Sequence, residues 1–183
     1  MKQMFAVLFC VCVLASSVCV ASEAPFEVMV VIPEFGQGGR HLCYAREQCN
    51  GPDFHVILKN TSRTPQNVFQ VCNSWGYNNI SFEMEYDGRR ISVVRKEFNK
   101  PASDVPFFWV LYPGEYRVYD IYLKEYTNVP STRGQRKPIK VKAVYRLGYD
   151  LYNPLRTFDF AGFWKGRVES APLEVMVGEC SPT

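Results

Sequence analysis

The stretch ISFEMEYDGRRISVVR, residues 80–95, decides the fold class expected of this 183-residue chain. Over residues 80–86, apolar side chains alternate with polar ones. The apolar face comprises Ile80, Phe82, Met84 and Tyr86. This two-residue period is typical of a β-strand with one buried and one solvated face. Asp87-Gly88 is a tight-turn dipeptide, and alternation resumes after it, so the stretch predicts an antiparallel β-hairpin.

The same period recurs along the chain, without any long helical period. Further strands are expected at residues 26–32, 54–58, 115–123, 139–147 and 164–177. The segment 115–123 is apolar on both faces, which favours a central or bulged strand. Pro172 indicates a bulge or an edge position in the last strand. About seven strands separated by turn signals predict an all-β fold, an antiparallel β-sandwich of immunoglobulin type.

The connections between these strands are long for a sandwich. They span residues 34–53, 63–79, 96–112, 124–137 and 148–163. Loops longer than about 12–15 residues are usually functional or disordered. Any specific binding activity is therefore expected in these loops.

Residues 1–24 have the pattern of a secretory signal peptide. Lys2 supplies a positive start, residues 4–20 are almost wholly apolar or small, and small residues follow up to Ala24. Cleavage after Ala24 is favoured, and cleavage after Ala21 also fits. A retained anchor is less favoured, because the apolar run of about 17 residues is at the lower limit for a membrane span and no basic cluster follows it. We expect an exported protein, periplasmic or extracellular, with one domain at residues 25–183.

The charge of the chain argues against one class of function, and its cysteine content indicates the state of the thiols. Loss of the leader removes Lys2 and Glu23, one charge of each sign, so the net charge stays at +3. That balance is too mild to indicate nucleic-acid binding. Of the seven cysteines, those outside the leader are Cys43, Cys49, Cys72 and Cys180. An even number of cysteines in an exported chain favours disulfide bonds.

The pairing of these four cysteines is not determined by sequence alone, because three connectivities exist. Closeness in sequence favours Cys43–Cys49, which leaves Cys72 and Cys180 unassigned. A bridge from Cys43 or Cys49 to Cys180 would instead staple the C-terminus to the loop between the first two strands. Both arrangements stay open.

One group of residues has the composition of a zinc site. His41, Cys43, Cys49 and His55 are zinc-ligand types, but their spacing matches no standard zinc finger. Export also favours oxidised cysteines over thiolate ligands. A disulfide is therefore favoured, and no metal or cofactor is expected.

Aromatic residues gather between residues 109 and 126. They are Trp109, Tyr112, Tyr116, Tyr119, Tyr122 and Tyr126. Most should lie in the core, because aromatics favour half-buried strands. Those that are exposed could stack on sugar rings or contact a protein. The candidate ligand-facing residues are Trp109, Tyr112, Tyr119 and Tyr122.

Glu83 and Glu85 are a possible catalytic pair. They lie on one strand face, about 7 Å apart at a rise of about 3.4 Å per residue, which is within the range of inverting glycosidases. A solvated strand face is the favoured interpretation. The chain contains no nucleophile elbow, phosphate loop or metalloprotease motif, so no enzyme activity is expected.

Two basic runs and two glycosylation sequons complete the candidate features. The basic residues are Arg133, Arg136, Lys137, Lys140 and Lys142, and Arg89, Arg90, Arg95 and Lys96. They could bind a polyanion, although a solvated face is the usual meaning of such runs. The sequons begin at Asn60 and Asn79 and matter only in a eukaryotic secretory route.

Three motifs together resemble a known group of proteins. They are NSWGY at residues 73–77 leading into ISFE at 80–83, LYPGE at 111–115, and FWKGRVES at 163–170. The set is similar to secreted bacterial proteins with an immunoglobulin-like sandwich and no assigned function, over roughly residues 54–177. The resemblance implies a fold and a compartment, and it carries no activity or catalytic residue.

The first functional hypothesis is therefore a non-enzymatic exported module that binds a protein or an envelope component through its long loops. The alternative is a carbohydrate-binding module that uses exposed aromatics. An enzyme that uses Glu83 and Glu85 is the least favoured of the three.

Overall fold

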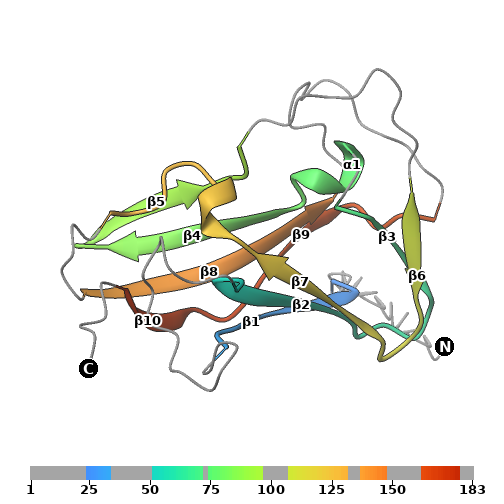
Figure 1. The fold of residues 1–183 in the computed structure, drawn as a ribbon. Coiled ribbons are helices and arrows are strands. Elements are labelled where there is room, and N and C mark those ends of the chain that lie inside the picture. Colours follow the sequence, from blue (N-terminus) through green and yellow to red (C-terminus); the bar gives the residue numbers. More distant parts are fainter. Residues whose placement is uncertain are drawn as a thin grey trace, which may run out of the picture.

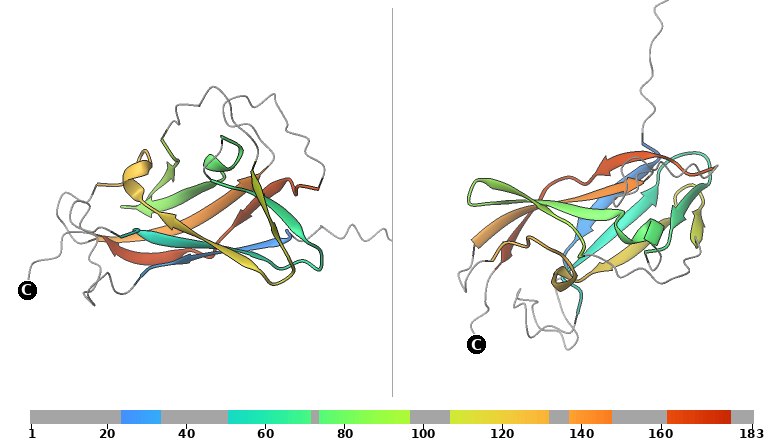
Figure 2. Two further views of the ribbon diagram at one scale, coloured as in Figure 1. Left: turned by 45° about the vertical axis from the view of Figure 1, so that its right-hand side comes forward. Right: turned by 90° about the horizontal axis from the view of Figure 1, so that it is seen from above.

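The computed structural model describes residues 24–33, 51–71, 74–96, 107–131, 137–147 and 162–177. These residues form strands β1 (Phe26–Val31), β2 (Phe54–Asn60), β3 (Gln66–Phe69), β4 (Ile80–Tyr86), β5 (Arg89–Val93), β6 (Phe108–Leu111), β7 (Tyr116–Ile121), β8 (Lys137–Leu147), β9 (Gly166–Glu169) and β10 (Leu173–Val177), with short helices α1 (Ser74–Tyr77) and η1 (Leu123–Glu125). All strand pairs are antiparallel. The two larger sheets face each other as layers (Figures 1 and 2). The prediction of an all-β antiparallel sandwich is confirmed.

One layer is a five-stranded sheet built on the predicted hairpin. Its order is β10-β8-β4-β5, with β9 also paired to β8. The β4–β5 turn places Asp87 at φ 49° and Gly88 at φ 74°. Two consecutive positive φ angles are the mark of a type I′ turn, whose twist matches that of the flanking strands. The local signal in residues 80–95 was therefore sufficient to predict this hairpin.

The closing segment of the chain contains a β-bulge. Val168 lies opposite Tyr145 and Leu173 opposite Val141, so five steps along this segment match four along β8. The extra residue divides the expected single strand into β9 and β10. The Ser170 hydroxyl accepts the Ala143 N–H at 3.0 Å within the irregularity. The bulge that Pro172 indicated is confirmed, at one edge of the sheet.

The other layer is a three-stranded sheet with the order β1-β2-β7. The expectation that residues 115–123 form a central or bulged strand was wrong, because β2 is the one pairing partner of β7 in the described part of the chain. Tyr119 and Ile121 face the core, whereas Tyr116 and Val118 are exposed. Apolar residues on both faces predict burial on both faces, but the outer face of β7 is exposed at Tyr116 and Val118.

Two further strands lie within segments expected to be loops. β3 and β6 pair as a two-stranded sheet at one end of the sandwich (Figures 1 and 2). Each has only four residues, too few to show a period. With the divided closing strand, they raise the strand number from the expected seven to ten within the described residues. No helix in these residues is both long and apolar enough to cross a membrane.

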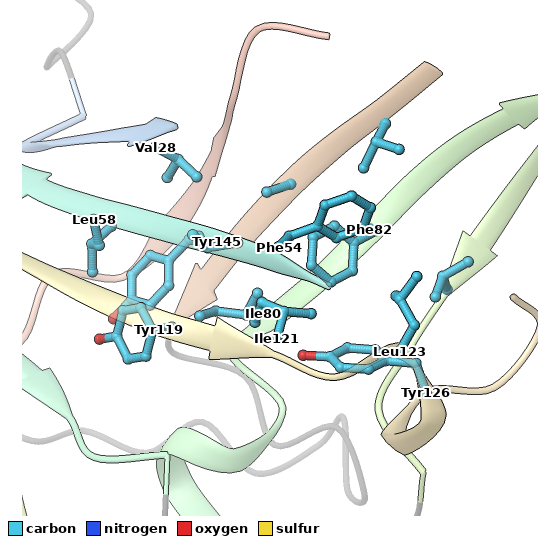
Figure 3. Packing of buried hydrophobic residues seen from close by; sticks show 14 of the residues in the cluster. Val28, Phe54, Leu58, Ile80, Phe82, Tyr119, Ile121, Leu123, Tyr126 and Tyr145 are labelled. Atoms are coloured by element: carbon cyan, nitrogen blue, oxygen red, sulfur yellow. The ribbon is translucent and has the colours of Figure 1, made fainter. Parts of the chain in front are cut away.

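The core lies between the two larger sheets (Figure 3). Its largest fully buried side chains are Tyr145, Phe54, Phe82, Leu58, Leu111, Val56, Val68, Val93, Val141 and Asn60. Aromatic edges meet aromatic faces across the layers, with ring centroids 5.7 Å apart for Phe26 and Tyr145. Such T-shaped contacts add to the stabilisation from buried area. The hydroxyls of Tyr119 and Tyr145 are buried in this core, and neither has a hydrogen-bond partner among the described residues.

These buried tyrosines should make the fold sensitive to alkali. Burial raises the pKa of Tyr126 to about 12 and raises the pKa values of Tyr119 and Tyr145 well above their ordinary value. The unfolded chain releases the same protons near pH 10. The stabilisation is thus complete below about pH 10 and is lost as pH rises towards the folded-state pKa values. In an alkaline titration, part of the tyrosinate absorbance should appear only together with loss of the β-sheet circular dichroism. Full ionisation near pH 10 with the sheet intact would contradict this burial.

Candidate interaction surface

The two sheets present chemically different outer faces. On the five-stranded sheet, Lys142 Nζ lies 2.7 Å from Glu169 Oε2. Arg167 Nη2 is 2.7 Å from Glu169 Oε1 and also contacts the Glu83 carboxylate. Hydrogen bonds from Lys142 and Arg167 lower the pKa of Glu169. This face is therefore covered by charges that neutralise one another across β4, β8 and β9.

The candidate catalytic pair belongs to this charged face. Glu83 is held by Arg167, and Glu85 lies opposite Arg90 on one side and Lys140 on the other. Both carboxylates thus have cationic neighbours on the solvent side of β4. The arrangement is that of an ion-pair network around Glu83, with basic residues opposite Glu85 on the two neighbouring strands.

Several residues of the basic runs are also paired within the fold. Lys137 Nζ is 3.0 Å from Asp87 Oδ2. Arg95 Nη2 is 2.5 Å from Glu125 Oε2, and its guanidinium lies over the ring of Tyr77 at 4.2 Å. With Lys142 bound to Glu169, these cations act as structural partners. Arg133 and Arg136 lie outside the described residues.

The outer face of the three-stranded sheet is apolar along its middle. Met29, Ile57 and Val118 lie side by side in register across β1, β2 and β7. Val118 is 49% exposed, and Val31 on the same face is 41% exposed. A polar row lies on either side of these residues. One contains Glu27 and Lys59, and the other contains His55, whose Nδ1 is 2.9 Å from Asp120 Oδ1.

The β7 strand adds an open backbone edge to this face. The Asn60 N–H donates to the Glu115 carbonyl at 2.9 Å, which places residues 115, 117, 119 and 121 in hydrogen-bonded positions against β2. The backbone groups of Tyr116, Val118 and Asp120 therefore point away from β2. No other described strand pairs with β7 on that side. We name the outer faces of Met29, Ile57, Val118 and Tyr116, together with this edge, the β7 surface.

The expected ligand-facing aromatics are dispersed. Tyr112 is 58% exposed in the turn before β7. Trp109 is partly buried, with the Arg117 guanidinium 4.6 Å from its ring centre, and Tyr122 is partly buried with Lys124 5.5 Å away. Tyr119 is only 6% exposed and packs in the core, so it is not available to a ligand. These rings do not form one aligned platform.

Sequence reasoning missed four other apolar residues that the structure exposes. They are Phe107, Phe108, Val110 and Val118. Phe108 and Val110 point outward from β6, a strand of four apolar residues inside an expected loop, so no alternation in the sequence marked them as exposed. Tyr116, which belonged to the predicted aromatic cluster without being a favoured ligand residue, is 60% exposed.

The candidate metal, disulfide and glycan positions are either outside the described residues or held by other contacts within the fold. His55 bonds Asp120, while His41 and the four cysteines Cys43, Cys49, Cys72 and Cys180 lie outside the described residues. In the part of the chain that is described, no three His, Cys, Asp or Glu side chains come together as metal ligands would. The amide nitrogen of Asn60 is bound inside the fold, and Asn79 is also buried. A glycan could not join either asparagine without unfolding its surroundings.

An apolar hollow at one end of the sandwich is too small for an organic ligand. It is lined by Phe54, Met84, Leu123, Val129, Pro130, Ile139 and Val141, and its volume is about 10 Å³. That space is about the minimum for one water molecule, and its walls offer almost no polar group to bind one.

Comparison of the chain with protein-family models, curated proteins and solved structures finds no match. Its function has to be inferred from the contrast between the two outer sheet faces and from the open edge of β7.

Proposed function

We propose that this chain is an exported, non-enzymatic β-sandwich module of immunoglobulin type that binds a protein partner through the β7 surface. The observation that supports this most is the apolar row of Met29, Ile57 and Val118 beside an open strand edge. Export to the periplasm or the extracellular space is supported by the leader pattern at residues 1–24, and residues 25–183 would form the single domain.

The chemistry of the surface fits a protein better than a sugar or a polyanion. An apolar centre with polar side chains around it is the usual composition of a protein interface. Here Lys59, His55 and Asp120 supply the polar border. An open edge also supplies backbone donors and acceptors, as in complexes where a partner adds a strand. The opposite sheet offers no comparable apolar row, because its outer face carries the network around Arg167.

A carbohydrate platform has less support in the structure. Sugar stacking needs exposed rings in suitable mutual positions. Of the four favoured aromatics, Tyr112 is the one that stays largely exposed, while Tyr119 is in the core and Arg117 lies over Trp109. The long loops expected to bind a partner lie mostly outside the described residues. We therefore base the proposal on the sheet face.

A matched pair of variants tests the proposal by affinity capture from a cell-envelope extract, read by mass spectrometry. Val118→Lys places a charge in the apolar row, whereas Ser92→Lys places the same charge at an exposed position of β5 on the other sheet. A specific partner should be retained by the wild type and by Ser92→Lys. Val118→Lys should retain it at least about tenfold less, the loss expected at an interface hot spot. Equal retention by all three proteins, or no partner at all, would overturn the proposal.

A further inference from the structure

The β7 edge has the geometry to pair with a copy of itself. Tyr116, Val118 and Asp120 all direct their N–H and C=O groups to the open side, because the alternate residues are bonded to β2. We infer that two copies of the chain associate by antiparallel pairing of their β7 strands. The inference deepens the proposed function, since it names a second copy as the occupant of the edge in the β7 surface.

Charge and strand length select one register for this pairing. Residues that point their backbone groups outward must face each other, so the two-fold axis passes at one of the five residues 116–120. An axis at Arg117 or Tyr119 pairs only two of the three outward residues with each other and leaves the third outside the strand ladder. An axis at Asp120 would set two carboxylates opposite each other, which is unfavourable. An axis at Tyr116 would bring the preceding turn at Gly114 into the ladder and leave Asp120 unpaired. An axis at Val118 uses the whole strand.

The Val118-centred register is complementary along its length. Val118 faces Val118 of the second copy, and Tyr116 faces Asp120 of the second copy, where a phenol O–H can donate to a carboxylate. Three paired positions provide about six backbone hydrogen bonds across the axis. Since Met29 and Ile57 already lie in register with Val118, the apolar row becomes continuous through six strands. In this register, the outward backbone groups of β7 form hydrogen bonds with the second copy, and the apolar row contacts the apolar row of that copy.

Both edges of the five-stranded sheet are protected, in contrast to β7. The β5 edge begins with the exposed residues Arg89 and Arg90, and the β10 edge follows Pro172 and the bulge. Charged residues, proline and bulges are the devices by which proteins prevent edge pairing. On β7, the Arg117 side chain lies over Trp109 and Asp120 is bound to His55. Neither charge therefore blocks the edge.

Cysteine cross-linking tests the inference on the full chain recovered after export. In the proposed register, the Cα atoms of the two residues at position 118 lie about 5.5 Å apart, within the range of a disulfide. Under mild oxidation, Val118→Cys should form a covalent dimer in most molecules. Val31→Cys, a similarly exposed position on the same face but two strands away, should stay at the wild-type level. Equal cross-linking of the two variants, or none above the wild type, would overturn the inference.

A second measurement avoids cross-links and added cysteines. Sedimentation equilibrium should give a dimer for the wild type and for Ser92→Lys, and a monomer for Val118→Lys, where two like charges would meet at the axis. A monomer for all three proteins would overturn the pairing of β7. That result would leave the capture of a different protein by the β7 surface standing, so the two proposals fail separately.

Discussion

Replacing Gly76 with alanine is expected to destabilise the domain by at least about 3 kcal/mol, the upper part of the range for overpacked sites. The added Cβ would overlap the carbonyl oxygen of Gln70 and lie 3.0 Å from that of Phe69. Both obstacles are backbone atoms at the end of β3, so no side-chain rotation relieves them. Urea denaturation should show the loss as a lower midpoint with an unchanged slope.

A second glycine serves as the control for this substitution. At Gly51, a Cβ would meet no atom within 4 Å. Gly51→Ala should therefore change the free energy of unfolding by less than about 0.5 kcal/mol, as expected for surface positions. Similar stability of Gly76→Ala and Gly51→Ala would show that α1 does not pack closely on the end of β3.

Replacing Asn60 with alanine is expected to reduce stability by about 3 kcal/mol, because several buried polar groups would lose their partners. The side chain is fully buried and its Nδ2 donates to the carbonyls of Thr64 and Leu111, each at 2.8 Å. Its Oδ1 accepts the Ser62 N–H at 2.9 Å and the Ser62 hydroxyl at 2.7 Å. Asn60 thus joins the end of β2 to the following turn and to β6.

The matched control is Asn67→Ala. Asn67 donates one exposed side-chain hydrogen bond, to the Gly162 carbonyl at 3.2 Å. Its loss should change stability by about 0.5 kcal/mol or less. Thermal unfolding by circular dichroism would measure both variants. If Asn60→Ala had the same melting temperature as Asn67→Ala, the four hydrogen bonds of the Asn60 side chain would not exist in solution.

The parts of the fold that could be predicted depend on local patterns. Residues 80–95 contain both strands of a hairpin and the turn between them. The hairpin could therefore be predicted without knowing which distant residues pack against it. Pro172 predicts a bulge or an edge because proline has no backbone N–H to donate to a strand ladder. The layered antiparallel arrangement followed from the repetition of such signals.

The rest depends on partners that lie far away in sequence. The sequence marks Asn60 only as the start of a sequon and gives no sign of its bond to Leu111, which spans 51 positions. The residues of β6 are all apolar and show no alternation within a segment that has the length of a loop. On β7, an apolar outer face has the same pattern whether a second layer of protein covers it or not. Tyr116 and Val118 therefore suggested a buried strand, although the structure exposes them.

Hydrogen exchange at the amides of β7 tests the central claim most directly. The claim is that the outward backbone groups of β7 are unpaired in the monomer and pair with β7 of a second copy. In dilute solution, the amides of Tyr116, Val118 and Asp120 should exchange quickly. Those of Arg117 and Tyr119, bonded to β2, should exchange slowly. As the protein concentration rises, the first three amides should become protected while the other two change little. Protection of all five in dilute solution, or rapid exchange of the first three at every concentration, would contradict the account.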